Sequence, residues 1–508
     1  MMMDLKNKIE KVMFPETSGK IDRYMMDEMH IPGIILMERA ASGIAQEIMK
    51  EFPAGGKAAV FCGGGNNGGD GYAAARILLT HGFSVVCISL TERELPQDAE
   101  INRNFIRNYK DTYISLTEDN LEEVFEKVQD CHLVIDAIFG TGLSREPAGI
   151  YLKAIERING LGKKVFAVDI PSGVFGKTGQ YSNAVRAYKT ITFQYRKPAH
   201  ILYPGAEMCG EVVVCPIGLD GDQEADMYYV DTLVMPKRKR NTHKGSYGSL
   251  ALVVGSKGMA GAAVLSASAS VAGGSGLTKV ICPETALRIV QEQVTEATCV
   301  VSGTYHLAEE DFPYALCETA TALAAGPGLG QNEEIRNILL KLLDQNHPKV
   351  FDADALNNLT AEDLRGKENL VITPHPKEFS RLFGISMREV LADPVSAAKT
   401  AAKEYGIVIL LKGAASVITD GNEVYLVGAG SPAMAKGGSG DVLTGLIGSL
   451  LAQGLKSIEA AYSAAYFCGE AGSLAAKRKG EYSAKARDTI ELLGHVMENK
   501  ILGFISTT

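Results

Sequence analysis

The chain has 508 residues, which is too long for one ordinary domain and predicts two or three. Its 46% hydrophobic and 22% charged residues are typical of a soluble globular protein. A formal net charge of −9 argues against nucleic acid as the main partner, because binding a polyphosphate normally needs a basic surface.

The sequence shows no pattern typical of a secretory signal, a membrane span or a disulfide framework. The N-terminus carries no apolar signal segment, and no stretch reaches the roughly 18 apolar residues of a membrane span. The nine cysteines are scattered without a C-x-x-C pair, which is typical of reduced, mostly buried thiols. We therefore expect a cytoplasmic protein with no membrane partner.

The first half alternates short apolar runs with helical segments. Residues 1–20 are expected to be a mobile or peripheral lead-in, and apolar residues at helical spacing predict a helix over 34–52. Buried strands are predicted at 60–62, 84–90, 132–138 and 164–170. This rhythm indicates an α/β domain over 1–225 with an open parallel sheet, whose ligands bind at the carboxyl ends of the strands.

A change of composition separates the two halves. An acidic run at 220–224 precedes the basic run 236–240. The basic run is compatible with a nucleic-acid or membrane patch, but we interpret it as part of a solvated interdomain linker over 226–240. The α/β rhythm restarts in a second domain, 241–508, with strands predicted near 250–254, 279–281, 322–325, 350–351, 370–372 and 408–411.

A glycine-rich loop, 63–71, follows the first predicted strand. Its Gly63-x-Gly65-x-x-Gly68 spacing matches the dinucleotide fingerprint, but Asp70 would repel a pyrophosphate unless a cation, such as a hard monovalent one, lay beside it. Two more acids, Asp136 and Asp169, lie at the carboxyl ends of neighbouring predicted strands. Each could cap a helix or form a turn, yet three at the carboxyl ends of strands favour a site.

These motifs resemble the NAD(P)H-hydrate epimerase family. The resemblance rests on 66–71, 136–142 and 168–173, with support from 36–41 and from the later 192–193 and 197–198. It implies a Rossmann-like fold and interconversion of the R and S forms of hydrated NADH or NADPH beside a potassium ion. It implies that Asp169 binds substrate near the reacting carbon, where a carboxylate can shuttle a proton as the C6 hydroxyl centre opens and recloses. It assigns potassium to Asn67, Asp136 and Ser172, and the nucleotide to Asn66, Asn67, Gly68, Gly69, Asp70, Gly140, Thr141, Gly142, Leu143, Ser144, Arg145 and Glu146.

A second glycine loop, 437–440, opens a predicted helix that begins with Asp441. Backbone N–H groups at such a helix start can surround a phosphate. Asp441 could then remove a hydroxyl proton during phosphoryl transfer, or simply be an acid that stabilises the helix dipole. His375, between two prolines, could be an ordinary loop histidine, and Lys412 a surface lysine at a strand end.

From about His243 to Asp488 the chain resembles the ADP-dependent NAD(P)H-hydrate dehydratase family, whose fold is ribokinase-like. The resemblance implies that ADP, with magnesium, phosphorylates the C6 hydroxyl of the S form, and that loss of phosphate then restores NAD(P)H and leaves AMP. The helix around 466–472 lacks a histidine that the family often carries there. By resemblance Ala262, Gly328, His375 and Asp441 bind the hydrate, Asp441 being catalytic, and Lys412, Gly413, Ala414, Ala415, Ser416 and Gly440 bind the adenine nucleotide.

The preferred interpretation is thus a fused enzyme of the bifunctional NAD(P)H-hydrate repair family, acting on small molecules as a homo-oligomer. One alternative is a ribokinase-like small-molecule kinase fused to a Rossmann oxidoreductase or nucleotide-binding domain. Another is a nucleotide sensor or scaffold whose N-terminal half is catalytically dead. The presence of Asp70, Asp136 and Asp169 argues against the sensor.

Overall fold

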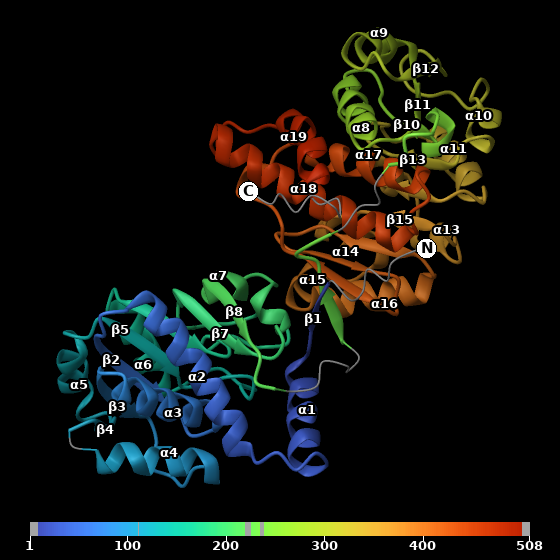
Figure 1. The fold of residues 1–508 in the computed structure, drawn as a ribbon. Coiled ribbons are helices and arrows are strands. Elements are labelled where there is room, and N and C mark those ends of the chain that lie inside the picture. The colour runs from blue at the N-terminus through green and yellow to red at the C-terminus, as the bar shows by residue number, and fades with distance from the viewer. Residues whose placement is uncertain (1–8, 110, 219–224, 234–237, 500–508) are drawn as a thin grey trace. The chain divides into compact units, whose positions relative to one another are not determined.

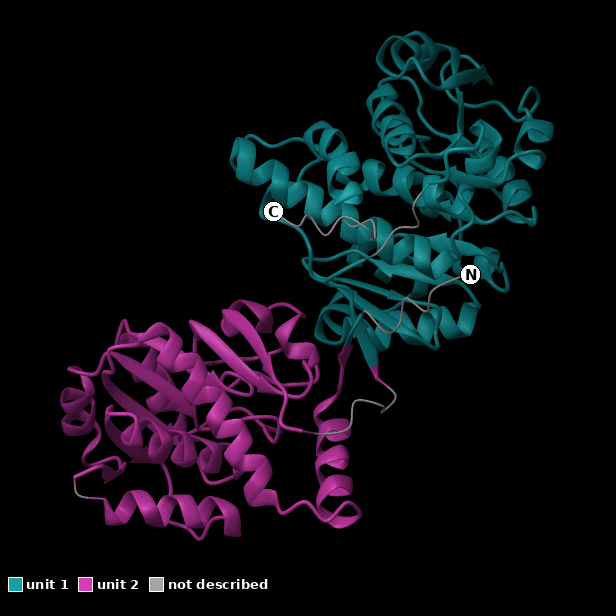
Figure 2. Ribbon diagram, in the orientation of Figure 1, with its two compact units in different colours: residues 1–10, 227–508 teal, residues 11–226 magenta. Residues whose placement is uncertain are grey.

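The computed structural model describes residues 9–109, 111–218, 225–233 and 238–499. The chain divides into two compact units, residues 11–226 and residues 1–10 with 227–508 (Figure 2). Within the described residues, none of the helices combines the length and the apolar character needed to cross a bilayer. All nine cysteines are free thiols, and only Cys215 and Cys299 are half-buried rather than buried.

The N-terminal unit is a seven-stranded parallel sheet covered on both faces (Figure 1). The strand order is β4-β3-β2-β5-β6-β7-β8. Every neighbouring pair runs parallel, so all carboxyl ends lie at the same edge. The strands are β2 (Lys57–Cys62), β3 (Ser84–Ser89), β4 (Tyr113–Ser115), β5 (Leu133–Ala137), β6 (Lys164–Val168), β7 (Lys189–Phe193) and β8 (Glu211–Cys215).

Alternate residues of the central strand β2 enter two separate cores, as the two-residue period of a strand requires. Ala58 and Val60 pack with helices α2, α3 and α4, whereas Ala59 and Phe61 pack with α5 and α6 on the other face. Both faces are therefore buried, which explains why the strands are continuous apolar runs. The helices are α1 (Pro15–Asp27), α2 (Gly33–Glu51), α3 (Asn66–Thr80), α4 (Gln97–Asn108), α5 (Leu121–Val128), α6 (Ile150–Gly160) and α7 (Gly205–Cys209), with the short 3₁₀ helix η2 (Pro198–His200).

The C-terminal unit is built on an eleven-stranded sheet. Its order is β1-β9-β18-β17-β16-β15-β14-β13-β10-β11-β12, and the strands from β12 to β16 are mutually parallel. The strands are β1 (Glu10–Val12), β9 (Met227–Tyr229), β10 (Ser249–Val253), β11 (Leu277–Cys282), β12 (Thr298–Val301), β13 (Ala322–Ala325), β14 (Lys349–Phe351), β15 (Leu370–Ile372), β16 (Val408–Leu411), β17 (Ser416–Thr419) and β18 (Val424–Val427).

One helix, α17 (Ser439–Ala452), lies at the centre of this unit. All of its residues from Val442 onward are buried, because it packs against the sheet and against α8 (Ala260–Ala272) and α18 (Ser457–Lys479). A Cβ at Gly445 would lie 2.1 Å from the carbonyl oxygen of Ser266, so glycine permits the close approach of α17 and α8. The other helices are α9 (Glu284–Gln293), α10 (Tyr314–Glu318), α11 (Glu333–Leu343), α12 (Asp354–Asn358), α13 (Ala361–Leu364), α14 (Pro376–Phe383), α15 (Met387–Ala392), α16 (Pro394–Tyr405), α19 (Ala486–Glu498) and the 3₁₀ helices η3 (Lys244–Tyr247) and η4 (Pro432–Met434).

The predicted α/β class, the helix over 34–52 and the central parallel strands are confirmed. Two local expectations differ from the structure. The lead-in, residues 1–20, contains β1 and the start of α1, and the linker expected over 226–240 begins with β9, which pairs with β18. Short polar-flanked strands of this kind gain their hydrogen bonds from a distant partner, so local composition does not reveal them. The acidic run 220–224 and residues 234–237 of that linker lie outside the described residues, as do the first two residues of the basic run 236–240.

Candidate active sites

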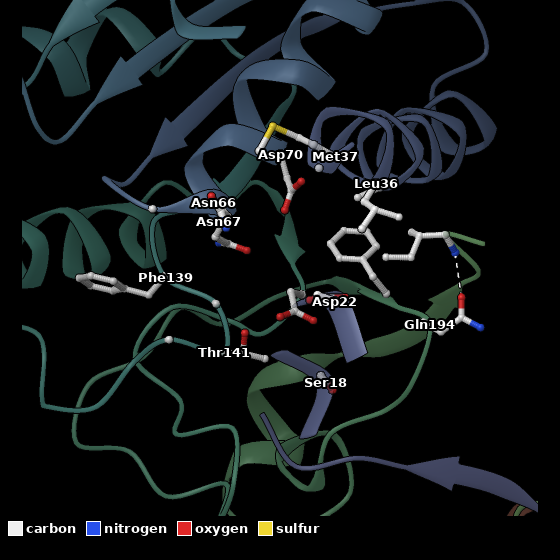
Figure 3. Close-up of a pocket in the computed structure, with 18 of the residues that line it drawn as sticks. Ser18, Asp22, Leu36, Met37, Asn66, Asn67, Asp70, Phe139, Thr141 and Gln194 are labelled. Atoms are coloured by element: carbon white, nitrogen blue, oxygen red, sulfur yellow. Dashed lines mark hydrogen bonds between the residues drawn. The ribbon is translucent and has the colours of Figure 1, made fainter. Parts of the chain in front are cut away.

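The first glycine loop connects β2 to α3 and borders a cavity of about 570 Å³ (Figure 3). Asn66, Asn67 and Asp70 of α3 line this cavity. Gly68 and Gly69 are packed closely against other parts of the protein: a Cβ there would lie 2.1 Å from Gly63 O and 2.6 Å from Met37 Cε, respectively. These two glycines let the helix start pack against the protein, while the polar residues around them face the cavity.

Of the other residues predicted to contact the nucleotide, some line the cavity and some do not. Gly140, Thr141, Gly142 and Leu143, in the loop after β5, line the cavity together with Asp169. Ser144, Arg145 and Glu146 are not among its lining residues. The loop therefore reaches the cavity with its first half only.

Asp136 and Ser172 form a tightly bonded, buried pair at the ends of β5 and β6. Ser172 Oγ donates to Asp136 Oδ1 at 2.6 Å, and Ser172 N donates to Asp136 Oδ2 at 2.8 Å. Burial raises the pKa of Asp136 to about 6, although the bonds from Ser172 oppose the shift. Asn67 lies next to the loop that follows β5, since a Cβ at Gly140 would stand 2.7 Å from Asn67 Oδ1. The buried Nδ2 of Asn67 has no hydrogen-bond partner among the described residues.

Asp169 is held by a buried lysine. Lys197 Nζ donates to Asp169 Oδ1 at 2.6 Å, and Thr192 Oγ1 donates to the same oxygen at 2.8 Å. Burial by itself would raise the pKa of Asp169, but Lys197 outweighs it and holds the pKa below its ordinary value. His200 Nε2 lies 2.8 Å from the Asp169 carbonyl oxygen, and burial lowers the pKa of this histidine to about 3, so it donates as a neutral ring.

Asp169 also adopts an unusual backbone conformation, with a φ of 65° that L side chains rarely take. Its N–H donates to Ile191 O of β7, and His200 holds its carbonyl group. The surrounding bonds thus fix this strained residue and aim its carboxylate at the cavity, where it is one of the lining residues.

Three more aspartates line the cavity with Asp169, namely Asp22, Asp70 and Asp98. Burial raises the pKa of Asp70 well above its ordinary value, and the charges of Asp169 and Asp22 raise it further. The pKa of Asp22 is raised by burial and by Asp169, with Lys197 opposing. Sequence reasoning gave no role to Asp22 or Lys197; only the Lys197-Pro198 motif contained a signal for the lysine.

The second glycine loop opens α17, as expected. Gly438 has a φ of 100°, and Asp441 lies in the first helical turn. A Cβ at Gly440 would lie 3.5 Å from Asp352 Oδ2 and 3.7 Å from Lys412 Nζ, so the loop, the acid and the lysine meet at one place. Burial, followed by the charge of Asp352, raises the pKa of Asp441 to about 6.

Asp352 connects two other parts of this site through hydrogen bonds. Its carboxylate accepts from Lys412 Nζ at 2.8 Å and from Thr444 Oγ1 of α17 at 2.9 Å. Burial would lower the pKa of Lys412, but Asp352 and Glu378 outweigh it and raise the pKa. Asp352 directly follows a buried parallel strand, which is the signal that could have identified it as a site residue.

The remaining site residues predicted in the second half lie in different local environments. His375 caps α14, its Nδ1 accepting from Lys377 N and Glu378 N at 3.2 Å each, and its side chain is half exposed. Ala262 and Gly328 lie together, because a Cβ at Gly328 would be 3.1 Å from Ala262 Cβ. Residues 412–415 form the connection from β16 to β17, and Ser416 is the first residue of β17. None of these residues lines a separate cavity of about 620 Å³ that is bordered by α18, β9 and the loop 428–432.

The fold and the two sites define a two-domain α/β protein in which each domain places carboxylates beside a glycine-rich helix start suited to nucleotides. Family models match each half: YjeF-related protein N-terminus over residues 33–199, and NAD(P)H-hydrate dehydratase over residues 250–493. The chain is 35% identical over 506 residues to the bifunctional NAD(P)H-hydrate repair enzyme Nnr of Moorella thermoacetica, covering 95% of each chain. It is 30% identical over 516 residues to the Escherichia coli enzyme of that name, covering 98% of each. The chain belongs to the bifunctional NAD(P)H-hydrate repair enzyme family, which confirms the predicted family.

Solved structures are similar to about half of the chain. An Enterococcus faecalis ribokinase-like superfamily protein aligns with a TM-score of 0.49 and 25% identity, covering 53% of this chain and 93% of that chain. The Bacillus subtilis ADP/ATP-dependent NAD(P)H-hydrate dehydratase co-crystallised with ATP/Mg²⁺ aligns with a TM-score of 0.46 and 28% identity, covering 53% of this chain and 95% of that chain.

Proposed function

We propose that this chain repairs hydrated nicotinamide dinucleotides in two steps. The N-terminal unit interconverts the R and S epimers at C6, and the C-terminal unit dehydrates the S epimer with ADP, releasing AMP and phosphate. The observation that carries the proposal is that the chain matches the repair enzymes over nearly their whole length and has acidic residues at both sites. The kinase–oxidoreductase alternative has no such support.

In the epimerase site, Asp169 would act on the hydroxyl at C6. Its pKa lies below the ordinary value because of Lys197, so the carboxylate is ionised at neutral pH and can accept a proton. Lys197 and Thr192 both donate to Oδ1. Oδ2 has no hydrogen bond within the part of the chain that the structure describes, which leaves this oxygen for the substrate. The loop carrying Gly140 to Leu143 and the helix start with Asn66 would bind the rest of the dinucleotide.

A potassium ion would be held by Asn67, Asp136 and Ser172. The donors are amide, carboxylate and hydroxyl oxygens, which hard cations prefer. Asp136 is fully buried and its bonded partners are neutral groups, so a monovalent cation would compensate its charge. When bound, the ion would offset negative charge near the dinucleotide phosphates.

In the dehydratase site, Asp441 would take the proton from the C6 hydroxyl while that oxygen attacks a phosphate of ADP. Its position in the first turn of α17 puts it beside the N–H groups of the glycine loop, which are suited to the transferring phosphate. The phosphorylated oxygen is then a good leaving group, whereas hydroxide is a poor one. Lys412 and Gly440 would contact the nucleotide.

Magnesium would accompany ADP. Magnesium at nucleotide sites is held by phosphate oxygens with one or two carboxylates, and we assign this role to Asp352 and Asp441. Asp352 raises the pKa of Asp441 through their like charges, which a divalent cation would offset.

The test uses R and S hydrates of NADH, separated and supplied singly to the full chain with magnesium. Recovery of reduced-nicotinamide absorbance from the S form is expected only with ADP, and recovery from the R form is expected to depend on potassium. ATP in place of ADP measures the donor preference, and hydrates of NADPH measure the substrate preference. Absence of recovery from either epimer with either nucleotide would refute the proposal.

A further inference from the structure

The N-terminal helix α1 contributes a face to the epimerase cavity. Ile21 and Met25, four residues apart, are buried in an apolar cluster that also holds Leu36 of α2. Ser18 and Asp22, also four residues apart, form a neighbouring stripe of the helix and line the cavity. The family model match starts at residue 33, after α1 has ended, so α1 completes the site from outside the matched region.

Asp22 faces the charged centre of the cavity. Among charged groups Lys197 acts on it most strongly, followed by Asp169 and then by Arg23 of its own helix. Asp70 of α3 also faces it, and Figure 3 shows both carboxylates beside the same open space. The Asp22 side chain has no hydrogen-bond partner within the described residues, which leaves its carboxyl group for a ligand. Asp98 of α4 is a further acid that lines the cavity.

We propose that Asp22 is a second catalytic carboxyl group of the epimerase site, which gives a proton to the ring nitrogen N1 while Asp169 takes the proton of the C6 hydroxyl. The proposal rests on the proposed epimerase function. It assigns a role to a residue that neither the loop motifs nor the matched region includes.

The proton balance of the reaction calls for two such groups. Opening of the C6 centre breaks the C6–N1 bond, leaves its electron pair on N1, and converts the C6 hydroxyl to a carbonyl. One proton leaves the oxygen and one arrives at N1, so the substrate gains none overall. Reclosure on the other face of the carbonyl returns the N1 proton to Asp22 and the oxygen proton from Asp169. Each cycle restores both carboxyl groups.

The environments of the two groups suit these opposite roles. The pKa of Asp169 is held low by Lys197, whereas burial and the charge of Asp169 raise the pKa of Asp22. Two carboxyl groups whose environments separate their pKa values can serve as base and acid at the same pH. Ionisation of Asp169 favours the protonated form of Asp22, because two adjacent negative charges repel each other.

The experiment compares Asp22→Asn with wild type in the full chain, where dehydration of the S epimer serves as an internal control. Asparagine keeps the shape of the side chain but cannot transfer the proton. We expect kcat/KM for epimerisation to fall by about 10²-fold or more, with dehydration of the S epimer unchanged. Asp27→Asn, on an exposed residue of the same helix, is the matched control and is expected to leave both rates unchanged.

The pH profile separates a catalytic role from a structural one. Wild-type epimerisation should fall as pH rises through the raised pKa of Asp22, because the acid form is lost. Asp22→Asn should lack this decline, and Asp22→Glu should retain it with part of the rate. A wild-type rate in Asp22→Asn, an equal loss of both activities, or a decline that Asp70→Asn removes and Asp22→Asn keeps would each overturn the inference. Failure of wild type to interconvert the epimers would instead overturn the proposed function.

Discussion

Replacing Lys197 by methionine would leave the carboxylate of Asp169 buried without its cation. The side chain of Lys197 is only 3% exposed and that of Asp169 is 11% exposed, so water can compensate little of the charge. Removing one partner from a buried ion pair costs about 3–5 kcal/mol, because the remaining charge is uncompensated. We expect a loss of stability of about this size in the N-terminal unit at neutral pH.

The stability difference between wild type and Lys197→Met should depend on pH, because the pKa of Asp169 differs between the two proteins. In the wild type the pKa of Asp169 is lowered, so its contribution to stability is present above the unfolded-state pKa and is lost as pH falls through the folded-state pKa. In Lys197→Met, burial would raise the pKa of Asp169, so the variant would lose stability as pH rises. The difference between the two proteins should therefore shrink on acidification.

The measurement is urea unfolding followed by circular dichroism, since the chain has no tryptophan, together with hydrogen exchange of peptides from β6 and β7. Lys153→Met is the matched control: its partner Glu118 is exposed, and the expected cost is about 0–1 kcal/mol. The double variant Lys197→Met with Asp169→Asn should regain part of the loss. Equal destabilisation by the two lysine variants, or a difference that does not change with pH, would refute the reasoning.

Three further predictions concern the two sites and the packing of α17. Asp441→Asn should slow dehydration by about 10²–10⁴-fold and spare epimerisation. The wild-type dehydration rate should fall as pH drops below about 6, where the pKa of this base lies, and a rate that stays constant below that pH would exclude Asp441 as the base. Gly140→Ala should weaken potassium activation of epimerisation, because the new Cβ would stand 2.7 Å from Asn67 Oδ1; unchanged potassium dependence would contradict the assigned ligand set. Gly445→Ala should destabilise the C-terminal unit by about 1–3 kcal/mol in thermal unfolding, since its Cβ would meet Ser266 O at 2.1 Å, and an unchanged Tm would show that the helices separate freely.

Several expectations from the sequence stay predictions. These are the homo-oligomeric state, the cytoplasmic location, the potassium ligands and the individual nucleotide contacts. The second-domain start at residue 241 is also a prediction, whereas the compact C-terminal unit includes β9 and therefore residues from Met227.

The sequence by itself determined the α/β class, the central parallel strands, the two glycine loops and the family. These features are local: an apolar run followed by a glycine turn is legible within about ten residues, and parallel strands buried on both faces are continuous apolar runs. The acids Asp136, Asp169 and Asp441 could be found for the same reason, because each directly follows such a run or opens such a helix.

Only the tertiary structure decided how those acids are partnered. Lys197 reaches Asp169 from the connection after the next strand, and Lys412 reaches Asp352 from the connection after a strand two places away in the sheet. Asp22 lies on a helix that precedes every strand of the N-terminal sheet. Ionisation depends on burial and on charges close in space, and sequence distance carries little information about either. Which carboxylate is held ionised and which is left to carry a proton is therefore a property of the folded chain.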